Sequence, residues 1–375
     1  MKAVLRREMR RIVTRPLEPL LLAVLPALAL AFTWAIFSAG LPRELPVAVV
    51  DQDHSRLSRQ LVRMIDATPT VRVAERPADP KAAEELVLAG RVYAYVLLPE
   101  GLERGVKRGQ AEPVVAYTNA QLLVPASLVR RDLLAATSTL SAGITLRRLR
   151  AAGETEASAR ARFEPVRADI HALFNPQLNY VSYIFVALFP TLLHVFVLLA
   201  AVNSVGSELR EGTAGEWLET AGGSVTRALA GKLLPSTVAF LAVAAVAMGV
   251  LFGLAGVPMR GSRALLLLGT LLFVLAYQAT GVLIVALFAN LRFATSVAAF
   301  LASPAFAYAG ITFPTMGMPA FARLWGALLP LTHYLKLLVD QSMKGAPAAV
   351  SAPSLLALLA FVVAAPLLAW PRRRV

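Results

Sequence analysis

Runs of apolar residues, each long enough to cross a lipid bilayer, recur along the 375-residue chain. There are six, and they comprise residues 20–37, 180–202, 233–257, 264–290, 293–313 and 353–370. A helix rises about 1.5 Å per residue, so roughly 20 residues cross about 30 Å of hydrocarbon. The pattern therefore predicts an α-helical integral membrane protein with six transmembrane helices.

The fifth run and the segment that follows it are rich in helix-breaking residues. Pro304 and Gly310 predict a kink or break within the fifth run. Residues 314–345 contain three more prolines, and their longest charge-free stretch has only twelve residues. So short a stretch favours re-entrant or interfacial helices, with Trp325 and Tyr334 at headgroup depth. We therefore expect residues 314–345 to form a re-entrant segment near the outer surface.

A polar connection, residues 204–232, joins two apolar runs that contain no charged residue. Its mixture of acidic, basic and apolar positions predicts a short amphipathic helix. A partner that moves this connection also moves both flanking helices, because the chain is tied to them at both ends. Taken alone, the same composition is equally typical of a solvated hairpin loop.

Between the first two apolar runs, residues 41–178 have the composition of a soluble domain. Alternating strand-like and helix-like patterns predict a small inserted α/β domain with a largely parallel sheet. The expected strands cover residues 46–51, 70–75, 92–99 and 113–119, and the expected helices cover residues 55–67, 80–89 and 100–108. Two longer stretches, residues 120–150 and 154–173, are predicted to form a helical stalk. Residues 1–40 then form an interfacial segment with the first span, and residues 179–375 form the other five.

Basic residues concentrate at both ends of the chain. They are Lys2, Arg6, Arg7, Arg10, Arg11 and Arg15 at one end and Arg372, Arg373 and Arg374 at the other. Six spans place both termini on one side, and the positive-inside rule makes that side the cytoplasm. Residues 41–178 are then extracytoplasmic and residues 204–232 cytoplasmic, in a multi-pass protein of a bacterial inner membrane. A cleavable signal peptide is the alternative for the first run, but its eighteen apolar residues exceed the usual core of about 7–15.

Composition excludes several classes of protein. A hydrophobic content of 57% is too high for a soluble protein. The net charge of +14 is spread over the ends and connections of the apolar runs, which suits contact with anionic membrane lipids and not nucleic acid. Cysteine is absent, so the chain has no disulfide and no thiolate metal site.

No catalytic or cofactor-binding constellation is visible in the sequence. The histidines His54, His171, His194 and His333 are scattered, without metal-ligand spacing. Residues 226–233 resemble a P-loop but lack its first glycine and its magnesium-binding hydroxyl, so they do not predict ATP binding. The chain is therefore not expected to be an enzyme. Polar or helix-breaking groups inside the spans are candidate pathway residues, and they are His194, Gln278, Pro304 and Gly310.

The sequence resembles the membrane subunit of ABC-2 type transporters, namely exporter permeases with a large extracytoplasmic domain after the first helix. The resemblance rests on the basic start through Arg15-Pro16, VAVVDQD, AGRVYAYVLLPEGLERGVKRGQ, ELREGT with WLET and GKLLP, and LWGALLPLTHYLKLLVDQSMKG. It assigns ATPase coupling to Glu208, Arg210, Glu211, Gly212, Thr213, Trp217, Leu218 and Thr220. Trp217 stands where an aliphatic residue is common, and Ala221 where proline is usual.

The resemblance implies a subunit that works with other chains. It implies a second permease copy or paralogue, two ABC ATP-binding subunits that hold ATP and Mg²⁺, and in some relatives a periplasmic adaptor protein. ATP binding in those subunits then drives export of a drug, lipid or other amphipathic molecule. The alternatives are a non-transporting membrane receptor or scaffold with an external sensing domain, and a secondary carrier. The apolar spans offer a carrier no deep carboxylate beyond Glu18.

Overall fold

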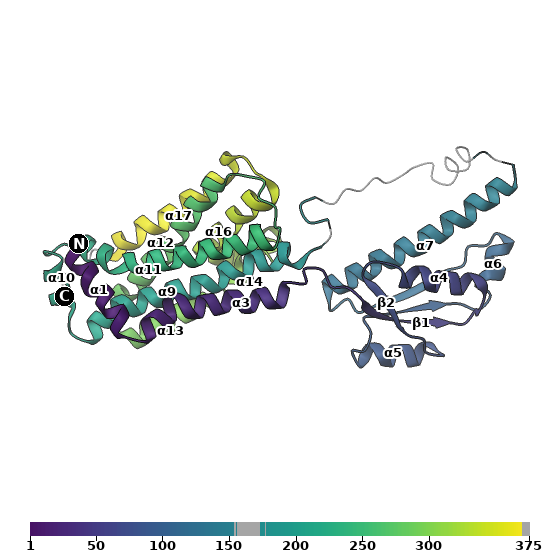
Figure 1. The fold of residues 1–375 in the computed structure, drawn as a ribbon, viewed down its shortest axis with the longest axis horizontal. Coiled ribbons are helices and arrows are strands. Elements are labelled where there is room, and N and C mark those ends of the chain that lie inside the picture. Colours follow the sequence, from purple (N-terminus) through teal and green to yellow (C-terminus); the bar gives the residue numbers. More distant parts are fainter. Residues whose placement is uncertain (154, 156–172, 177, 370–375) are drawn as a thin grey trace. The chain divides into compact units, whose positions relative to one another are not determined.

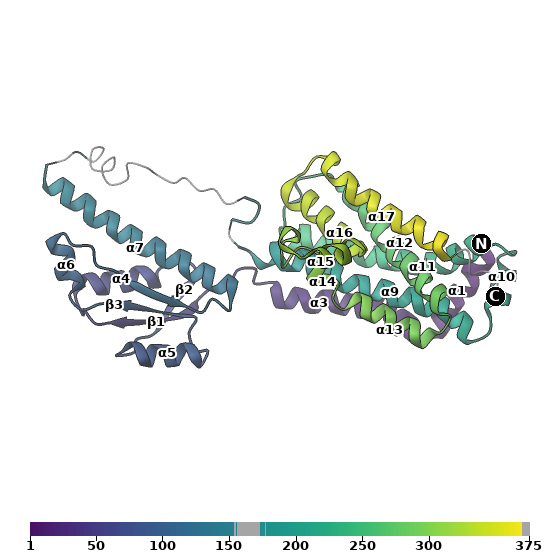
Figure 2. The same cartoon turned by 180° about the vertical axis from the view of Figure 1, so that it is seen from behind.

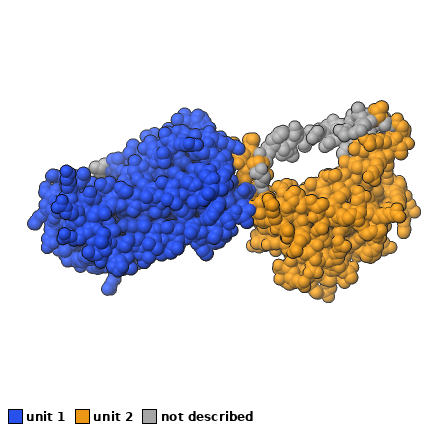
Figure 3. Space-filling view, in the orientation of Figure 1, with its two compact units in different colours: residues 1–40, 179–375 blue, residues 41–178 orange. Residues whose placement is uncertain are grey.

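A computed structural model describes residues 1–153, 155, 173–176 and 178–369 of the chain. The chain is divided into two compact units (Figure 3). Unit 1 contains residues 1–40 and 179–375, and unit 2 contains residues 41–178. Helices dominate unit 1, whereas unit 2 combines helices with a small sheet (Figure 1).

Unit 1 contains four helices that are long and apolar enough to cross a membrane, and they are Leu17–Phe37, Val181–Arg210, Val225–Leu254 and Arg263–Phe288. The first combines α2 (Leu17–Pro19), η1 (Leu20–Val24) and α3 (Leu25–Phe37). The second combines η2 (Val181–Phe185) and α9 (Val186–Arg210), and the third combines α11 (Val225–Met248) and η3 (Gly249–Leu254). The fourth is α12 (Arg263–Phe288). These four confirm a helical membrane protein, whereas the count of six spans stays a prediction.

The remaining apolar runs form shorter or differently bounded helices. The fifth run is broken as expected, because α13 (Leu291–Ala302) ends two residues before Pro304 and only the four-residue α14 (Ala305–Tyr308) follows. The last run forms α17 (Ala348–Ala369). Its arginine cluster, residues 372–374, lies outside the described residues.

The predicted re-entrant segment consists of short helices. They are η4 (Thr315–Gly317), α15 (Ala320–Ala327), α16 (Pro330–Val339) and η5 (Asp340–Lys344). Tyr334 is only 4% exposed: its ring stacks on Phe273 with centroids 4.3 Å apart, and its hydroxyl lies 2.9 Å from that of Thr270. Tyr334 is thus packed against α12, which supplies both a ring and a hydroxyl partner, and its expected depth in the bilayer stays a prediction.

Helix α9 lies at the centre of unit 1. Of its most apolar stretch, 67% is buried, against 22% for the helix Leu17–Phe37 at the periphery. It crosses α12 closely, because a Cβ on Gly281 would lie 2.8 Å from the Cβ of Ala201 and 3.2 Å from the backbone oxygen of Leu198. Glycine therefore allows α9 and α12 to approach closely.

Unit 2 is a four-stranded sheet with helices on both faces. The strands are β1 (Leu45–Asp51), β2 (Val71–Glu75), β3 (Ala94–Leu98) and β4 (Val115–Thr118), in the order β2-β1-β3-β4. Only the β3–β4 pair is antiparallel, so the expected largely parallel sheet is present. Each strand lies within one of the four predicted runs, apart from a one-residue extension of β1.

The helices of unit 2 lie within a few residues of their predicted ranges. They are α4 (Arg56–Asp66), α5 (Pro80–Leu88), α6 (Leu102–Arg108) and α7 (Leu123–Ala151). The hydroxyl of Ser55 accepts a hydrogen bond from the Ser58 amide at 3.0 Å, which caps α4. Helices α4 and α7 cover one face of the sheet, and α5 covers the other. The stalk helix predicted for residues 154–173 falls almost wholly outside the described residues.

The polar connection differs most from expectation. Within residues 204–232, α9 continues to Arg210 and α11 begins at Val225, which leaves only the short α10 (Ala214–Thr220) and its two turns between them. The amphipathic helix is present, but the loop around it is much shorter than predicted. The N-terminal residues form α1 (Lys2–Thr14), which lies beside α10 and α11.

Candidate functional site

Polar side chains gather where α1, the end of α9 and the start of α11 meet. Figure 2 shows α1 and α10 at the same end of unit 1. We define the charge cluster as Arg7, Glu8, Arg11, Glu18, Glu208 and Lys232.

Lys232 lies at the centre of the charge cluster. Its side chain is 0% exposed, and its Nζ donates to Oε2 of Glu8 at 2.9 Å and to Oε1 of Glu208 at 2.6 Å. The ammonium also lies 5.5 Å from the ring centroid of Trp217, which is within the range of a cation–π contact. Lys232 thereby ties α11 to both α1 and α9.

Two arginines of α1 complete the pairing. Arg7 donates to both carboxylate oxygens of Glu208 at 2.9 Å each, in the bidentate geometry that guanidinium groups favour. Arg11 donates to Glu18 at 2.6 Å and to the backbone oxygen of Ser204 at 3.1 Å.

Neutral groups satisfy further acceptors in the same place. The hydroxyl of Ser204 donates to Glu8 at 3.0 Å, and the amide of Asn203 donates to Glu18 at 3.2 Å. The cluster thus contains three cations and three anions and is neutral as a whole. Burial of a charge is tolerated only when it is paired and hydrogen-bonded. This pairing allows Glu208 and Lys232 to be buried within α9 and α11, so both helices extend through these charged residues.

A second ion pair lies at the surface, about one helical turn beyond Arg11 and Glu208 along the chain. Arg15 donates to both carboxylate oxygens of Glu211, at 2.8 and 2.7 Å, and Arg210 donates to Glu211 at 2.9 Å. The hydrogen bond from Arg15, with help from Arg210, lowers the pKa of Glu211 to about 2. Glu211 is therefore ionised throughout the physiological range.

The turn from α9 into α10 depends on Gly212. This residue has φ = 70°, the left-handed region that favours glycine. The amide of Thr213 donates to the backbone oxygen of Glu208 at 2.9 Å, and that of Gly212 donates to Leu209 at 3.3 Å, which together form a Schellman motif. The Thr213 hydroxyl also donates to Oε2 of Glu208 at 2.5 Å, which couples the turn to the charge cluster.

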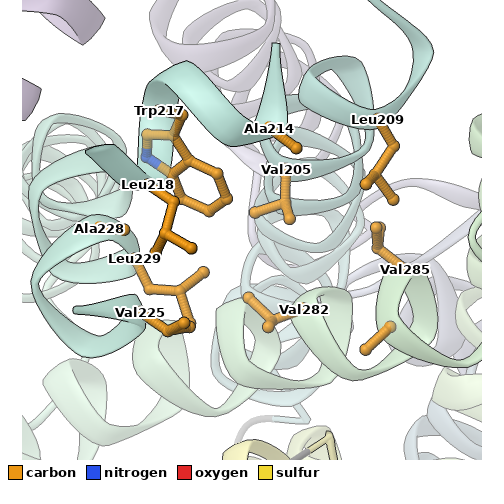
Figure 4. Close-up of a pocket in the computed structure, with 11 residues that line it drawn as sticks. Val205, Leu209, Ala214, Trp217, Leu218, Val225, Ala228, Leu229, Val282 and Val285 are labelled. Atoms are coloured by element: carbon orange, nitrogen blue, oxygen red, sulfur yellow. The ribbon is translucent and has the colours of Figure 1, made fainter. Parts of the chain in front are cut away.

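Helix α10 covers an apolar hollow. This cavity has a volume of about 290 Å³, and Figure 4 shows Trp217 and Leu218 of α10 above it, with side chains of α9, α11 and α12 around it. The ring nitrogen of Trp217 is buried and has no hydrogen-bond partner among the described residues. On the other side of α10, Glu216 and Glu219 are exposed, and Thr220 bonds its hydroxyl to the Glu216 backbone oxygen at 2.7 Å. Helix α10 thus presents an acidic face to solvent.

The candidate pathway residues are not brought together in one place. Gln278 lines a second apolar cavity of about 470 Å³ between α11, α12 and α17. Its amide accepts from Thr237 at 2.9 Å and donates to Ser236 at 3.0 Å. Gln278 therefore joins α12 to α11.

The other three candidates lie elsewhere in unit 1. His194 is completely buried, with its ring centroid 4.8 Å from that of Tyr277. Pro304 precedes α14, and Gly310 has φ = 81° in the turn that follows it. Among the described residues, no group of three or more histidine or acidic side chains is placed to hold a metal ion.

Sequence reasoning missed Lys232 and Glu8, which lie with Glu208 in the charge cluster. Glu8 is the one acidic residue among six basic ones in residues 1–16, and Lys232 is the one lysine in residues 204–232. An isolated opposite charge such as Glu8 is a usable signal for pairing, whereas Lys232 shares its segment with Arg210 and Arg227 and gives no such signal. The turn at Gly212, by contrast, was within the predicted coupling set.

Comparison with known proteins identifies a family. A family described as "ABC-2 family transporter protein" matches residues 20–370. No curated protein gives a significant match to the chain.

Proposed function

Because the chain belongs to the ABC-2 family of transporter proteins, we propose that it is the permease subunit of an ATP-driven exporter. Two permease copies, or this chain and a paralogue, form the membrane pathway. Separate ATP-binding subunits hydrolyse ATP and push on α10. The observation that carries this proposal is the attachment of α10 between α9 and α11, whose ends are joined by the buried charge cluster.

The proposed direction of force follows from the contacts of α10. Within the described residues, no ion pair anchors α10 itself to the bundle, whereas Glu208 and Lys232 at its two flanks share a hydrogen bond of 2.6 Å. A displacement of α10 therefore reaches α9 and α11 together. Because α9 lies against α12 and α13, it transmits the displacement to the centre of unit 1.

The proposed topology has six spans, with α13–α14 as the fifth and α17 as the sixth. Both termini and α10 face the cytoplasm of a bacterial inner membrane, and unit 2 lies outside, where a periplasmic adaptor has access to it. The basic residues of α1 support this orientation. The substrate is an amphipathic molecule such as a drug or lipid, which the apolar cavity beside Gln278 supports.

Charge reversal on the exposed face of α10 tests the proposal. The variant Glu216→Lys with Glu219→Lys alters only solvent-exposed positions outside the charge cluster. We propose that basic residues of the ATP-binding subunit face these two glutamates. Lysines at both positions then place like charges across the interface, which is expected to weaken copurification of the subunit by about tenfold or more and to reduce ATP hydrolysis by the complex.

A matched control reverses two exposed glutamates of α5, Glu84→Lys with Glu85→Lys, and changes the net charge equally. It is expected to copurify as the parent does. Equal copurification of the α10 variant and the control contradicts the coupling role of α10.

A further inference from the structure

The basic residues of α1 fall into two sets on opposite faces of the helix. Arg7 and Arg11 point inward and belong to the charge cluster. Lys2, Arg6 and Arg10 are exposed, and none of them has an ion pair within the described residues. One face is thus neutralised by unit 1, whereas the other carries three uncompensated positive charges.

Apolar side chains share this outward face. Met9 is 47% exposed and Val13 is 79% exposed. At 100° per residue, both lie within one third of a turn of Lys2 and Arg6. A cationic face with exposed apolar residues is typical of helices that lie in the interface of an anionic bilayer.

The chain itself places α1 at the bilayer surface. Helix α1 ends at Thr14, and the apolar helix Leu17–Phe37 begins three residues later. Leu17, the first residue of that helix, is 67% exposed. Figure 1 shows α1 running across the end of the bundle, whereas α3 runs along it. Headgroups are therefore the nearest anionic layer to Arg6 and Arg10 once the span is inserted.

We propose that the outward face of α1, formed by Lys2, Arg6, Met9, Arg10 and Val13, binds the headgroups of anionic phospholipids and thereby regulates coupling. Binding holds α1 against the membrane, and its inward face then holds Glu208 and Lys232 in place beside α10. The regulatory part rests on the proposed coupling function. Lipid binding by the face itself does not.

The effect of each charge has a known scale. A basic residue close to an anionic membrane surface contributes about fivefold to an association constant, and the attraction weakens with ionic strength. Removal of all three charges is therefore expected to weaken the lipid response by about 100-fold. Replacement by glutamine keeps the length and polarity of each side chain and leaves the charge cluster unchanged.

A fluorophore at residue 13 of the full-length chain tests the lipid contact without ATP hydrolysis. Since the chain has no cysteine, Val13→Cys supplies one thiol for a solvent-sensitive fluorophore. The labelled protein is reconstituted in vesicles of phosphatidylcholine alone or with increasing phosphatidylglycerol. We expect phosphatidylglycerol to shift the emission to the blue and salt to reverse the shift. The triple variant Lys2→Gln/Arg6→Gln/Arg10→Gln is expected to need far more phosphatidylglycerol for the same shift. The control Arg56→Gln/Arg63→Gln/Lys81→Gln removes three exposed charges from unit 2 and is expected to respond as the parent does.

The same vesicles then carry the complex with its ATP-binding subunits. We expect phosphatidylglycerol to raise ATP hydrolysis in the parent and the control, and much less in the α1 triple variant. Emission that ignores phosphatidylglycerol overturns the inference and leaves the coupling role of α10 untouched. Loss of the ATP-binding subunit from the triple variant in detergent also overturns it, because the face then contacts that protein. A lipid-dependent emission shift with no effect on hydrolysis keeps the binding site but overturns its regulatory role.

Discussion

Replacement of Lys232 by methionine is expected to release α1 from the ends of α9 and α11. The ammonium is completely buried and is shared by Glu8 and Glu208, at 2.9 and 2.6 Å. Its removal leaves two cations facing three carboxylates whose side chains are each at most 7% exposed. Loss of one partner of a buried ion pair costs about 3–5 kcal/mol, and we expect the docking of α1 to weaken by this amount.

Thiol labelling measures this docking directly. Val4 of α1 is 1% exposed and packs with Ala221 and Ala228. Val4→Cys therefore places the single thiol of the chain on the buried side of α1. Its maleimide labelling requires α1 to open. A loss of about 3 kcal/mol or more raises the open population, and with it the labelling rate, by at least about 100-fold in Lys232→Met.

A second substitution separates charge imbalance from lost packing. Glu8→Gln added to Lys232→Met restores two cations to two carboxylates, and it is expected to recover most of the protection of the thiol at position 4. Lys336→Met is the control, because Lys336 pairs with buried Asp340 at 2.9 Å but is itself 55% exposed, and Lys344 still pairs with that carboxylate. Labelling of Lys232→Met at the parent rate, or no recovery with Glu8→Gln, refutes the account of the charge cluster.

Three further predictions concern other parts of the chain. The pKa of Glu211 is lowered to about 2, so the stability from its pair with Arg15 is fully present above pH 4.5 and is lost as the pH falls towards 2. The ratio of ATP hydrolysis between the parent and Glu211→Gln is therefore expected to be constant from about pH 6 to 8. The two rates are expected to converge only in the acidic range. Gly281→Leu forces a side chain against Ala201 and the α9 backbone, and it is expected to lower the free energy of unfolding of the purified chain, measured by thermal denaturation, by about 1–3 kcal/mol. Gly143→Leu in α7 is the control, because Gly143 has open space around it, and no such loss is expected. Ser55→Ala removes the cap of α4 and is expected to cost unit 2 about 1 kcal/mol in hydrogen-exchange protection of that helix.

Local patterns were sufficient for most helices and strands. Apolar run length predicted the four long helices, and alternating strand-like and helix-like patterns predicted the strands and helices of unit 2. The boundaries of α9 and α11 were not predictable in this way, because a charged residue normally ends a span. Their charges are paired with α1, and the Glu8–Lys232 hydrogen bond joins residues 224 positions apart. A pattern read over one helix cannot contain a partner at that separation.

The resemblance to permeases singled out the segment of the candidate site, and tertiary contacts supplied the partners of its charged residues. Gly212 and Thr213 lie in a left-handed turn after α9, within the segment that the resemblance to permeases singles out. The contacts of Tyr334 were not predictable from the sequence, because tyrosine is equally suited to a bilayer surface and to a core that supplies a hydroxyl partner. The packing of α16 on α12 supplies that hydroxyl partner.

Cross-linking from α10 tests the central claim most directly. Glu216→Cys places one thiol on the exposed face of α10, and Gln110→Cys places one on unit 2 as a control. In intact cells that also contain the ATP-binding subunits, a membrane-permeant cross-linker with one thiol-reactive and one amine-reactive end is expected to join the thiol at position 216 to a lysine of those subunits. The same thiol is expected to resist a membrane-impermeant maleimide, whereas the thiol at position 110 reacts with it. Labelling of position 216 from outside the cell, without an adduct, contradicts the proposal that α10 receives the force of ATP hydrolysis.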